Sequence, residues 1–448
     1  MSNVTPPLGT SINGGMQNRK ATHVHDELYA RAVVMDDGQN QLAMVVVDNC
    51  MIPREVYDEA KRLAREQTEI PTESILVSAT HSHSAGSAAH VFQSPPDEPY
   101  MEFLTHRIAD AIVRAWNNLE PARIGWGSGE VPGQVFNRRW FVRSEENRRN
   151  PFGGTDAVRM NPPRDPAELI EPAGPTDPEL SIIALQSLDG RPIALLANYS
   201  LHYVGGVGPG HISADYFGAF SHIMKRRLEE QHDGSANPYE HPPFVAIMSN
   251  GTSGDINNID FTQPAEPQPA YAQIYKVAED VAEEALKVYQ DLGFKEWVPL
   301  QSRVSEIELG VRLPDQADLQ RAREIVQRAE GPAMQGAEEI YARETIYLSE
   351  YPERVSLILQ TVKIGELAVA AIPCEVFVEI GLDLKQNHPF DDLFTISLAN
   401  GYNGYLPTVE QHQLGGYETW RAKSSYLEVE AAPKIVDRLS TLLDELRE

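Results

Sequence analysis

Two histidines, His81 and His83, lie two positions apart at the end of a short apolar run. Residues 75–77 are all apolar, which indicates a buried strand, and small or polar residues follow at once. In extended backbone, side chains two apart point the same way, so both imidazoles can face one cavity. Imidazole is the commonest metal ligand and an acid or base at neutral pH. The pair alone fits hydrogen-bonded loop residues equally well, so its meaning depends on other segments.

Two further apolar segments end in residues of chemical interest. Residues 194–197 lead toward His202, and a single histidine at such a place is more often structural than catalytic. Residues 244–248 lead into a turn of small residues, 251–254, followed by Asp255. Such a turn can present backbone N–H groups to an oxyanion, and it also fits a plain tight connection.

A carboxylate and two tyrosines follow later in the chain. Glu375 comes just after the apolar residues 368–372, where a carboxylate is costly unless it is paired, hydrogen-bonded or bound to a metal. An arginine partner is the simplest alternative to the metal. Tyr405 and Tyr417 lie in glycine-rich segments, which either present their phenols or pack them with the hydroxyls satisfied.

Considered together, these segments indicate a type of site that no single segment indicates. Each can be explained by structure when it is taken singly. Together they offer two histidines, a carboxylate and a tyrosine at the ends of predicted strands. Two histidines and one carboxylate, with water in the open position, is the composition of a hydrolytic zinc site. The sequence therefore favours a metal-dependent hydrolase.

Along most of its length the chain resembles the neutral (non-lysosomal) ceramidase family. The segment 80–84, Thr-His-Ser-His-Ser, resembles the family's T-H-T-H-S motif and is the most specific part of the match. In the segment 372–375, Cys374 replaces the glycine of the family's P-G-E motif. The other matching segments are 6–9, 28–32, 47–52, 137–138, 176–178, 254–255, 405–408 and 417–418.

The resemblance implies a zinc amidohydrolase that binds one Zn²⁺ per chain. It assigns four metal ligands: His81, His202, Glu375 and Tyr405. It assigns a second group to catalysis and substrate binding: His83, Arg138, Tyr417 and Asp255. In the implied reaction, water activated by zinc attacks an amide carbonyl, and His83 is the first candidate for protonating the departing amine.

The elements that must position these residues alternate along the chain. The alternation predicts an α/β fold with a large mixed β-sheet core flanked by helices and the active site at strand ends. The predicted strands are residues 28–34, 42–47, 75–78, 182–185, 193–198, 244–248, 355–362, 367–372 and 394–398. The predicted helices are residues 55–65, 100–118, 216–230, 271–289, 318–329 and 427–446. Strands that are apolar throughout, such as 44–47, indicate a sheet covered on both faces.

We expect residues 1–448 to form a single ceramidase-like catalytic domain. Residues 143–178 are rich in Pro, Gly and Arg and predict a long surface loop that shapes substrate choice. Residues 315–350 predict a helical insertion. Full-length members of the family carry a further C-terminal β-sandwich domain, which we expect to be absent because this chain ends in a predicted helix.

The composition limits the partners and the compartment. A net charge of −27 argues against nucleic acid and anionic membrane surfaces as partners. We find neither a stretch long enough for a membrane span nor the apolar core of a signal peptide, so we expect no stable membrane anchor. The expected location is cytoplasmic, or secreted or periplasmic if a leader was removed. The two cysteines predict buried free thiols, and the oligomeric state stays open.

We expect a small-molecule or lipid-like amide as substrate, with ceramide as one candidate. An ester or lactone hydrolase using the same metal site is an alternative, because activated water attacks each of these carbonyls. The third hypothesis belongs to another class, a metal-free binding protein that kept the fold.

Overall fold

The computed structural model describes residues 1–231, 241–388 and 390–447, and its core contains three four-stranded sheets. The first sheet has the order β1 (Ser2–Asn3), β5 (Tyr29–Asp36), β6 (Gln41–Val47), β7 (Ile75–Ala79). The second has the order β16 (Val245–Asn250), β14 (Pro192–Tyr199), β13 (Glu179–Ser187), β8 (Ala122–Glu130). The third has the order β18 (Leu300–Gly310), β19 (Arg354–Ile364), β20 (Leu367–Ala371), β22 (Asp392–Ile396).

Each of these sheets contains one parallel pair among antiparallel neighbours. The pairs are β6 with β7, β14 with β16, and β20 with β22. A parallel pair needs a crossover, and here a helix lies between its strands in each case: α1 (Arg54–Thr68), α3 (Asp215–Gln231) and α7 (Val378–Gln386). The two strands of each pair therefore end at the same edge of their sheet.

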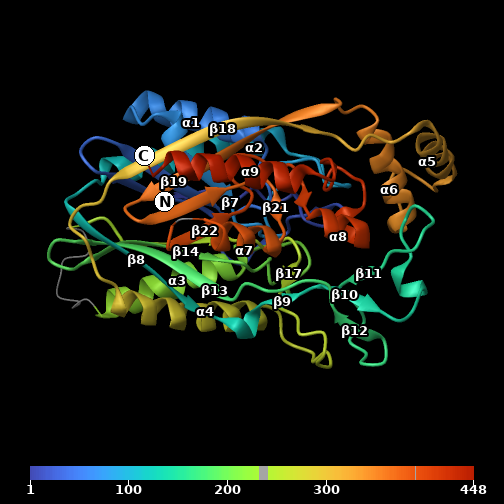
Figure 1. Cartoon of the computed structure of the whole chain (residues 1–448), viewed down its shortest axis with the longest axis horizontal. Helices are drawn as coiled ribbons and strands as arrows, with labels where there is room; N and C mark the ends of the chain where they lie inside the picture. The colour runs from blue at the N-terminus through green and yellow to red at the C-terminus, as the bar shows by residue number, and fades with distance from the viewer. Residues whose placement is uncertain (232–240, 389, 448) are drawn as a thin grey trace.

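The three sheets share one apolar core and carry their helices on the outside (Figure 1). In β6, Met44 and Val46 point into the shared core, whereas Val45 and Val47 point to α1 and α2 (Glu98–Asn117). The outer face of the second sheet packs against α3 and α4 (Ala272–Asp291). The third packs against α7 and α9 (Ala431–Glu445). Burial on both faces explains why β6 is apolar at successive positions.

Hydrogen bonds join the three sheets where their parallel pairs end. The Ala79 N–H donates to the Leu398 carbonyl at 3.2 Å, which links the first sheet to the third. The Ser397 N–H donates to the Asn250 carbonyl at 2.9 Å, which links the third to the second. The Asn250 side chain donates to the Thr80 carbonyl at 3.2 Å and closes the set. The carboxyl ends of strands from all three sheets therefore meet at one place.

Smaller elements surround this meeting point. Four two-stranded sheets pair β2 (Ser11–Ile12) with β3 (Arg19–Lys20), β4 (His23–Val24) with β15 (His211–Ile212), β9 (Phe136–Asn137) with β17 (Ile256–Asn257), and β21 (Glu375–Val376) with β23 (Tyr405–Leu406). Helix α8 (Val409–Leu414) follows β23. Figure 1 shows the sheet of β10 (Arg139–Val142), β11 (Val158–Met160) and β12 (Leu169–Pro172) at the same end of the molecule as helices α5 (Gln316–Arg328) and α6 (Gly336–Leu348).

The predicted α/β fold class is confirmed, with the mixed sheet core divided among three sheets. Every predicted strand and helix has a counterpart, and residues 315–350 contain the helices α5 and α6. The longer strands β8 and β18 and the helices α7 and α8 were not predicted. Residues 143–178 contain the short strands β11 and β12 as well as loops. Cys50 and Cys374 are buried and free, as expected. In the part of the chain that the structure describes, we find no helix with the length and apolarity needed to cross a membrane.

Candidate metal centre

Three potential ligand atoms converge where the sheets meet. His81 follows β7, His202 follows β14, and Glu375 begins β21 just after β20, so each sheet supplies one of them. His81 Nε2 lies 3.0 Å from His202 Nε2 and 3.2 Å from Glu375 Oε2. His202 Nε2 lies 3.9 Å from Glu375 Oε2. All three side chains are buried, and together they form the His81–His202–Glu375 cluster.

Backbone carbonyl groups set the orientation of both imidazoles. His81 Nδ1 lies 2.8 Å from the Cys50 carbonyl oxygen, and His202 Nδ1 lies 3.0 Å from that of Ser253. A carbonyl oxygen only accepts, so each Nδ1 must carry the proton. The unprotonated Nε2 of each ring then faces the cluster. Metal-binding histidines are oriented in this way by a hydrogen bond from the second ring nitrogen.

The cluster offers a set of acceptor atoms that could hold a cation. Glu375 Oε2 is buried and accepts no hydrogen bond, although it faces two nitrogen lone pairs. In the described ranges, neither arginine nor lysine lies within 4.0 Å of Glu375, which removes the arginine alternative. Three convergent acceptors without a donor are costly in a buried place. Two imidazoles and a carboxylate are a ligand set typical of Zn²⁺, so the residues fit that ion.

The pKa values of His81 and His202 are shifted in opposite directions. Burial lowers the pKa of His81, but the Glu375 carboxylate outweighs burial and holds the pKa well above its ordinary value. Burial, reinforced by Arg138, keeps the pKa of His202 well below its ordinary value. A proton shared by His81 and Glu375 therefore satisfies the protein groups alone. A divalent cation held by these residues would take the place of that proton and release it.

Two tyrosines approach the carboxylate. β21 and β23 pair in parallel, which makes Glu375 and Tyr405 register partners. Burial raises the pKa of Tyr405 well above its ordinary value. The Tyr402 hydroxyl donates to Glu375 Oε1 at 3.0 Å. Tyr402 was not predicted; its signal in the sequence was only its place in the same glycine-rich segment as Tyr405.

Arg138 is fixed by several buried partners. Its Nε donates to Glu418 at 2.9 Å, and its Nη2 donates to the Gly254 carbonyl at 2.7 Å. The same Nη2 donates to the Tyr405 hydroxyl at 3.1 Å. Arg139 donates to the second oxygen of Glu418 at 2.7 Å. The structure therefore brings Arg138 to the cluster through Tyr405, and Glu418 is a positioning residue that sequence reasoning did not single out.

His83 lies beside the cluster on its less buried side. Its Nε2 is 3.0 Å from His81 Nε2, and its ring stacks on Tyr203 with centroids 3.7 Å apart. Burial and His81 hold the pKa of His83 well below its ordinary value. The two histidines meet through a turn, since His81 has φ 73°, and the expectation of extended backbone was wrong. The ring of Tyr417 lies 5.9 Å from that of Tyr405.

Asp255 lies apart from the cluster. Its Oδ1 accepts from the Val378 N–H at 2.9 Å, and its Oδ2 accepts from the Asn137 side chain at 2.7 Å. Burial and the neighbouring Glu379 raise the pKa of this carboxyl. Asp255 therefore ties three segments together, and neither of its oxygens hydrogen-bonds to His81, His202 or Glu375.

The turn at residues 251–254 is also mostly occupied by internal bonds. The Gly251 N–H donates to the Tyr199 carbonyl at 2.9 Å, and the Gly254 N–H donates to the Val376 carbonyl at 2.8 Å. The Thr252 N–H donates to the Ser200 hydroxyl at 3.2 Å. These three N–H groups hold the turn in place, which for them favours the tight connection over contact with an oxyanion.

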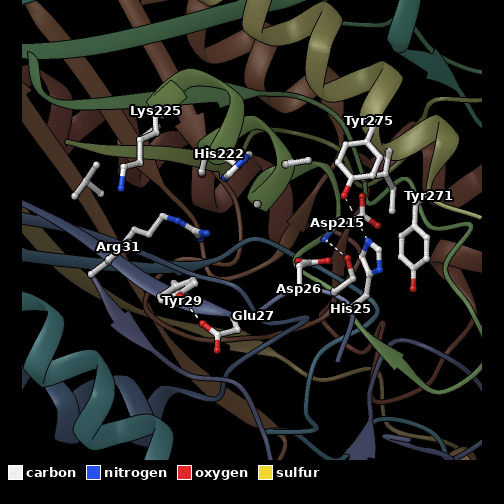
Figure 2. A pocket seen from close by; sticks show the side chains of 18 of the residues that line it. His25, Asp26, Glu27, Tyr29, Arg31, Asp215, His222, Lys225, Tyr271 and Tyr275 are labelled. Carbon is white, nitrogen blue, oxygen red and sulfur yellow. Dashed lines mark hydrogen bonds between the residues drawn. The ribbon is translucent and has the colours of Figure 1, made fainter. Parts of the chain in front are cut away.

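Asp215 supports the loop that follows His202. Its carboxylate accepts from the N–H groups of Val204 and Gly205 at 2.9 and 2.8 Å, in addition to starting α3. A cavity of about 450 Å³ lies on its other side. Figure 2 shows Arg31 and Lys225 on one side of this cavity and Asp26 on the other. The predicted ligands and catalytic residues do not line it.

The fold and the cluster together define an α/β protein with a candidate divalent-metal centre. A model of the family described as "Neutral/alkaline non-lysosomal ceramidase, N-terminal" matches residues 6–263, more than half of the chain. The chain belongs to this family. The matched range contains His81, His83, Arg138, His202 and Asp255.

Curated relatives and solved structures agree with this membership. Neutral ceramidase B of Dictyostelium discoideum is 25% identical over 52% of this chain and 31% of its own length. Neutral ceramidase of Pseudomonas aeruginosa is 23% identical over 60% of this chain and 39% of its own length. The chain thus spans about a third of the curated relatives it matches.

The solved structures bear on the fold. The crystal structure of the Pseudomonas aeruginosa neutral ceramidase superposes with a TM-score of 0.73, at 16% identity, over all of this chain and 73% of that one. A structure described as ceramidase complexed with C2 gives 0.71 at 16% identity, over all of this chain and 74% of that one. At this identity the likeness establishes the three-sheet fold.

Proposed function

We propose that this chain is a zinc-dependent hydrolase that cleaves an amide (N-acyl) bond with water activated by the metal. The observation that carries the proposal is the buried His81–His202–Glu375 cluster, in which Glu375 Oε2 has no hydrogen-bond donor. Family membership supports the same reaction, because the relatives are named neutral ceramidases. The proposed substrate is an amide of lipid-like or smaller size.

The ligands of the ion are His81, His202, Glu375 and Tyr405. When bound, Zn²⁺ supplies Lewis acidity, which lowers the pKa of a water molecule and polarises a carbonyl oxygen. Arg138 donates to the Tyr405 hydroxyl and so holds the phenol toward Glu375. Tyr402 holds the other carboxylate oxygen. The ligand set is therefore supported by a second layer of hydrogen bonds, as metal sites require.

His83 is the residue placed to move a proton. It lies at the less buried side of the cluster, and stacking on Tyr203 fixes its ring. Its depressed pKa keeps the imidazole neutral at pH 7, so Nε2 can accept a proton and then deliver it to a departing amine. Tyr417 borders the space next to Tyr405, where it can contact the substrate.

The test is a substrate panel assayed on protein stripped of metal and reloaded with one equivalent of zinc. We expect cleavage of N-acyl amides to return with zinc. Glu375→Gln removes the charge without changing shape, and we expect both zinc retention and turnover to fall by about 100-fold or more. Glu366→Gln is the matched control, because Glu366 is exposed and pairs with Lys295 on the surface.

The panel also separates amides from other carbonyl compounds of the same chain length. Cleavage of esters or lactones without amides would keep the hydrolytic site and contradict the amide assignment. Amide cleavage that is unchanged in Glu375→Gln would contradict the site itself.

A further inference from the structure

A small cavity lies beside the metal centre, outside the ligands already described. Its volume is about 180 Å³, and Tyr417 and Met16 belong to its walls. Tyr417 contacts Tyr405 edge to face, with ring centroids 5.9 Å apart. Met16 is two residues after Gly14, which packs so closely on His83 that a Cβ at position 14 would overlap the ring. The segment of Tyr417 and the segment of Met16 therefore each connect the cavity to the residues of the metal centre.

The charge of this cavity is opposite to that of the molecule. Three arginines, Arg148, Arg149 and Arg159, line it, with Asp156 as the one carboxylate in the lining. The chain as a whole has 65 acidic and 38 basic residues, with a net charge of −27. The lining thus carries an excess of positive charge, whereas the chain as a whole carries an excess of negative charge.

None of the three arginines has a carboxylate within 4.0 Å in the part of the chain that the structure describes. Arg148 donates through Nη1 to the Asp156 carbonyl oxygen at 2.8 Å, and its buried Nε has no acceptor. Some other arginines with limited exposure do have such partners, whereas Arg312 donates to carbonyl and hydroxyl oxygens instead. The paired ones are Arg138 and Arg139, which share Glu418, Arg191 with Glu120, and Arg421 with Asp318.

The carboxylate of Asp156 is committed to other donors. Its Oδ1 accepts from the Asn150 side chain at 2.9 Å. Its Oδ2 accepts from the Gly416 N–H at 3.0 Å and from the Trp420 indole N–H at 2.7 Å. Asp156 thereby anchors the segment that carries Tyr417. Its bonds hold that segment in place, and among the described residues the three guanidinium groups are left without an ion-pair partner.

We propose that this cavity binds an anionic group of the substrate, so that the preferred N-acyl compounds carry a carboxylate, sulfonate or phosphate near the scissile amide. The inference rests on the proposed function and names the substrate class of that site. Guanidinium groups form charge-assisted, often bidentate, bonds with such anions. The neighbouring Met16, Met160 and Trp420 contact the apolar part of the molecule. The positive lining also attracts an anionic substrate to an otherwise acidic protein.

The experiment compares two amides of equal chain length, an N-octanoyl amino acid and an N-octanoyl amino alcohol. We expect the wild-type, zinc-loaded protein to prefer the anionic amide in kcat/KM by about 10-fold or more. The double variant Arg149→Gln/Arg159→Gln should lose that preference, mainly through KM, with less than about a 2-fold change for the neutral amide. Arg164→Gln is the control, because Arg164 lies in the same segment, donates to Pro264 and does not line the cavity.

Three outcomes would overturn the inference. The first is equal kcat/KM for both amides in the wild type, and the second is an unchanged preference in the double variant. The third is a double variant that only relieves inhibition by free octanoate, which would assign the cavity to the released carboxylate.

Failure of the proposed function is recognised separately. If the zinc-loaded wild type cleaves neither amide, calorimetry of N-octanoyl amino acid binding still tests the cavity. Binding weakened by about 10-fold or more in the double variant, and unchanged in Arg164→Gln, supports the inference. Equal binding by all three proteins overturns it.

Discussion

At the scale of single residues, the candidate centre depends on what each side chain does with its second polar atom. His81 and His202 use Nδ1 on backbone carbonyl groups, and Glu375 uses Oε1 on Tyr402. The remaining atom of each faces the cluster. Because two of these supports come from backbone, they do not depend on the side chain at positions 50 and 253.

Glu418 is the residue-scale support with the largest expected effect on stability. It is buried between Arg138 and Arg139, so Glu418→Gln leaves two buried guanidinium groups without a carboxylate. We expect the free energy of unfolding to fall by about 3–5 kcal/mol. Glu120→Gln, at the more exposed pair with Arg191, should cost about 1 kcal/mol or less. Denaturant unfolding of both variants checks this, and equal losses would contradict the role given to Glu418.

At the scale of elements, the sequence predicted the strands that carry the cluster because they are apolar throughout. β8 was missed because Gly125, Gly127 and Gly129 alternate along it and weaken the strand pattern. The structure gives the reason for two of them: a Cβ at Gly127 would press on Leu292, and one at Gly129 would overlap Glu284 on α4. The tertiary neighbour that requires glycine cannot be inferred from the strand itself.

The ligands of the candidate site could be predicted from the sequence, but the residues that support them could not. The predicted ligands lie at the ends of predicted strands, and the structure brings His81, His202 and Glu375 within reach of one ion. The supports come from distant positions. Glu418 lies 280 residues from Arg138, and composition or spacing does not indicate that pair. A polar residue after a buried strand can also hold neighbouring backbone, and Asp255 does so at Val378.

The loop around Gly14 gives an element-scale prediction. Gly14 has φ +96° and packs on the His83 ring, whereas Gly38 has φ +88° with open space around it. Gly14→Ala and Gly38→Ala should each destabilise the protein by about 1–2 kcal/mol through backbone strain. Only Gly14→Ala should also lower kcat, by about 10-fold or more, because it displaces His83. Kinetics and zinc content of both variants test this, and equal kcat values would contradict the role of His83.

At the scale of the whole molecule, the three sheets are held together by buried polar contacts as well as by the shared core. Lys61 on α1 donates to the Asn400 side chain at 2.7 Å, and Asn400 donates to Gln360 on β19 at 2.8 Å. Burial lowers the pKa of Lys61 to about 8. Burying the charged ammonium group of Lys61 therefore costs folding free energy at neutral pH.

The lowered pKa of Lys61 makes the free energy of unfolding increase with pH. Between pH 8 and 10.5 the unfolded chain keeps a proton on Lys61 that the folded chain has lost. Stability from this group therefore rises with pH across that window. We expect the unfolding free energy of the wild type, minus that of Lys61→Met, to increase by about 3 kcal/mol from pH 7 to pH 10.5. Denaturant unfolding at several pH values measures it, and a difference that stays constant would contradict the burial of a titrating Lys61.

The most direct test of the central claim is the metal content of the purified protein, measured by plasma mass spectrometry together with the double variant His81→Ala/His202→Ala. We predict about one zinc ion per chain in the wild type and less than about a tenth of that in the variant. A wild-type protein that neither contains zinc nor takes it up, or a variant that retains a full equivalent, would contradict the account.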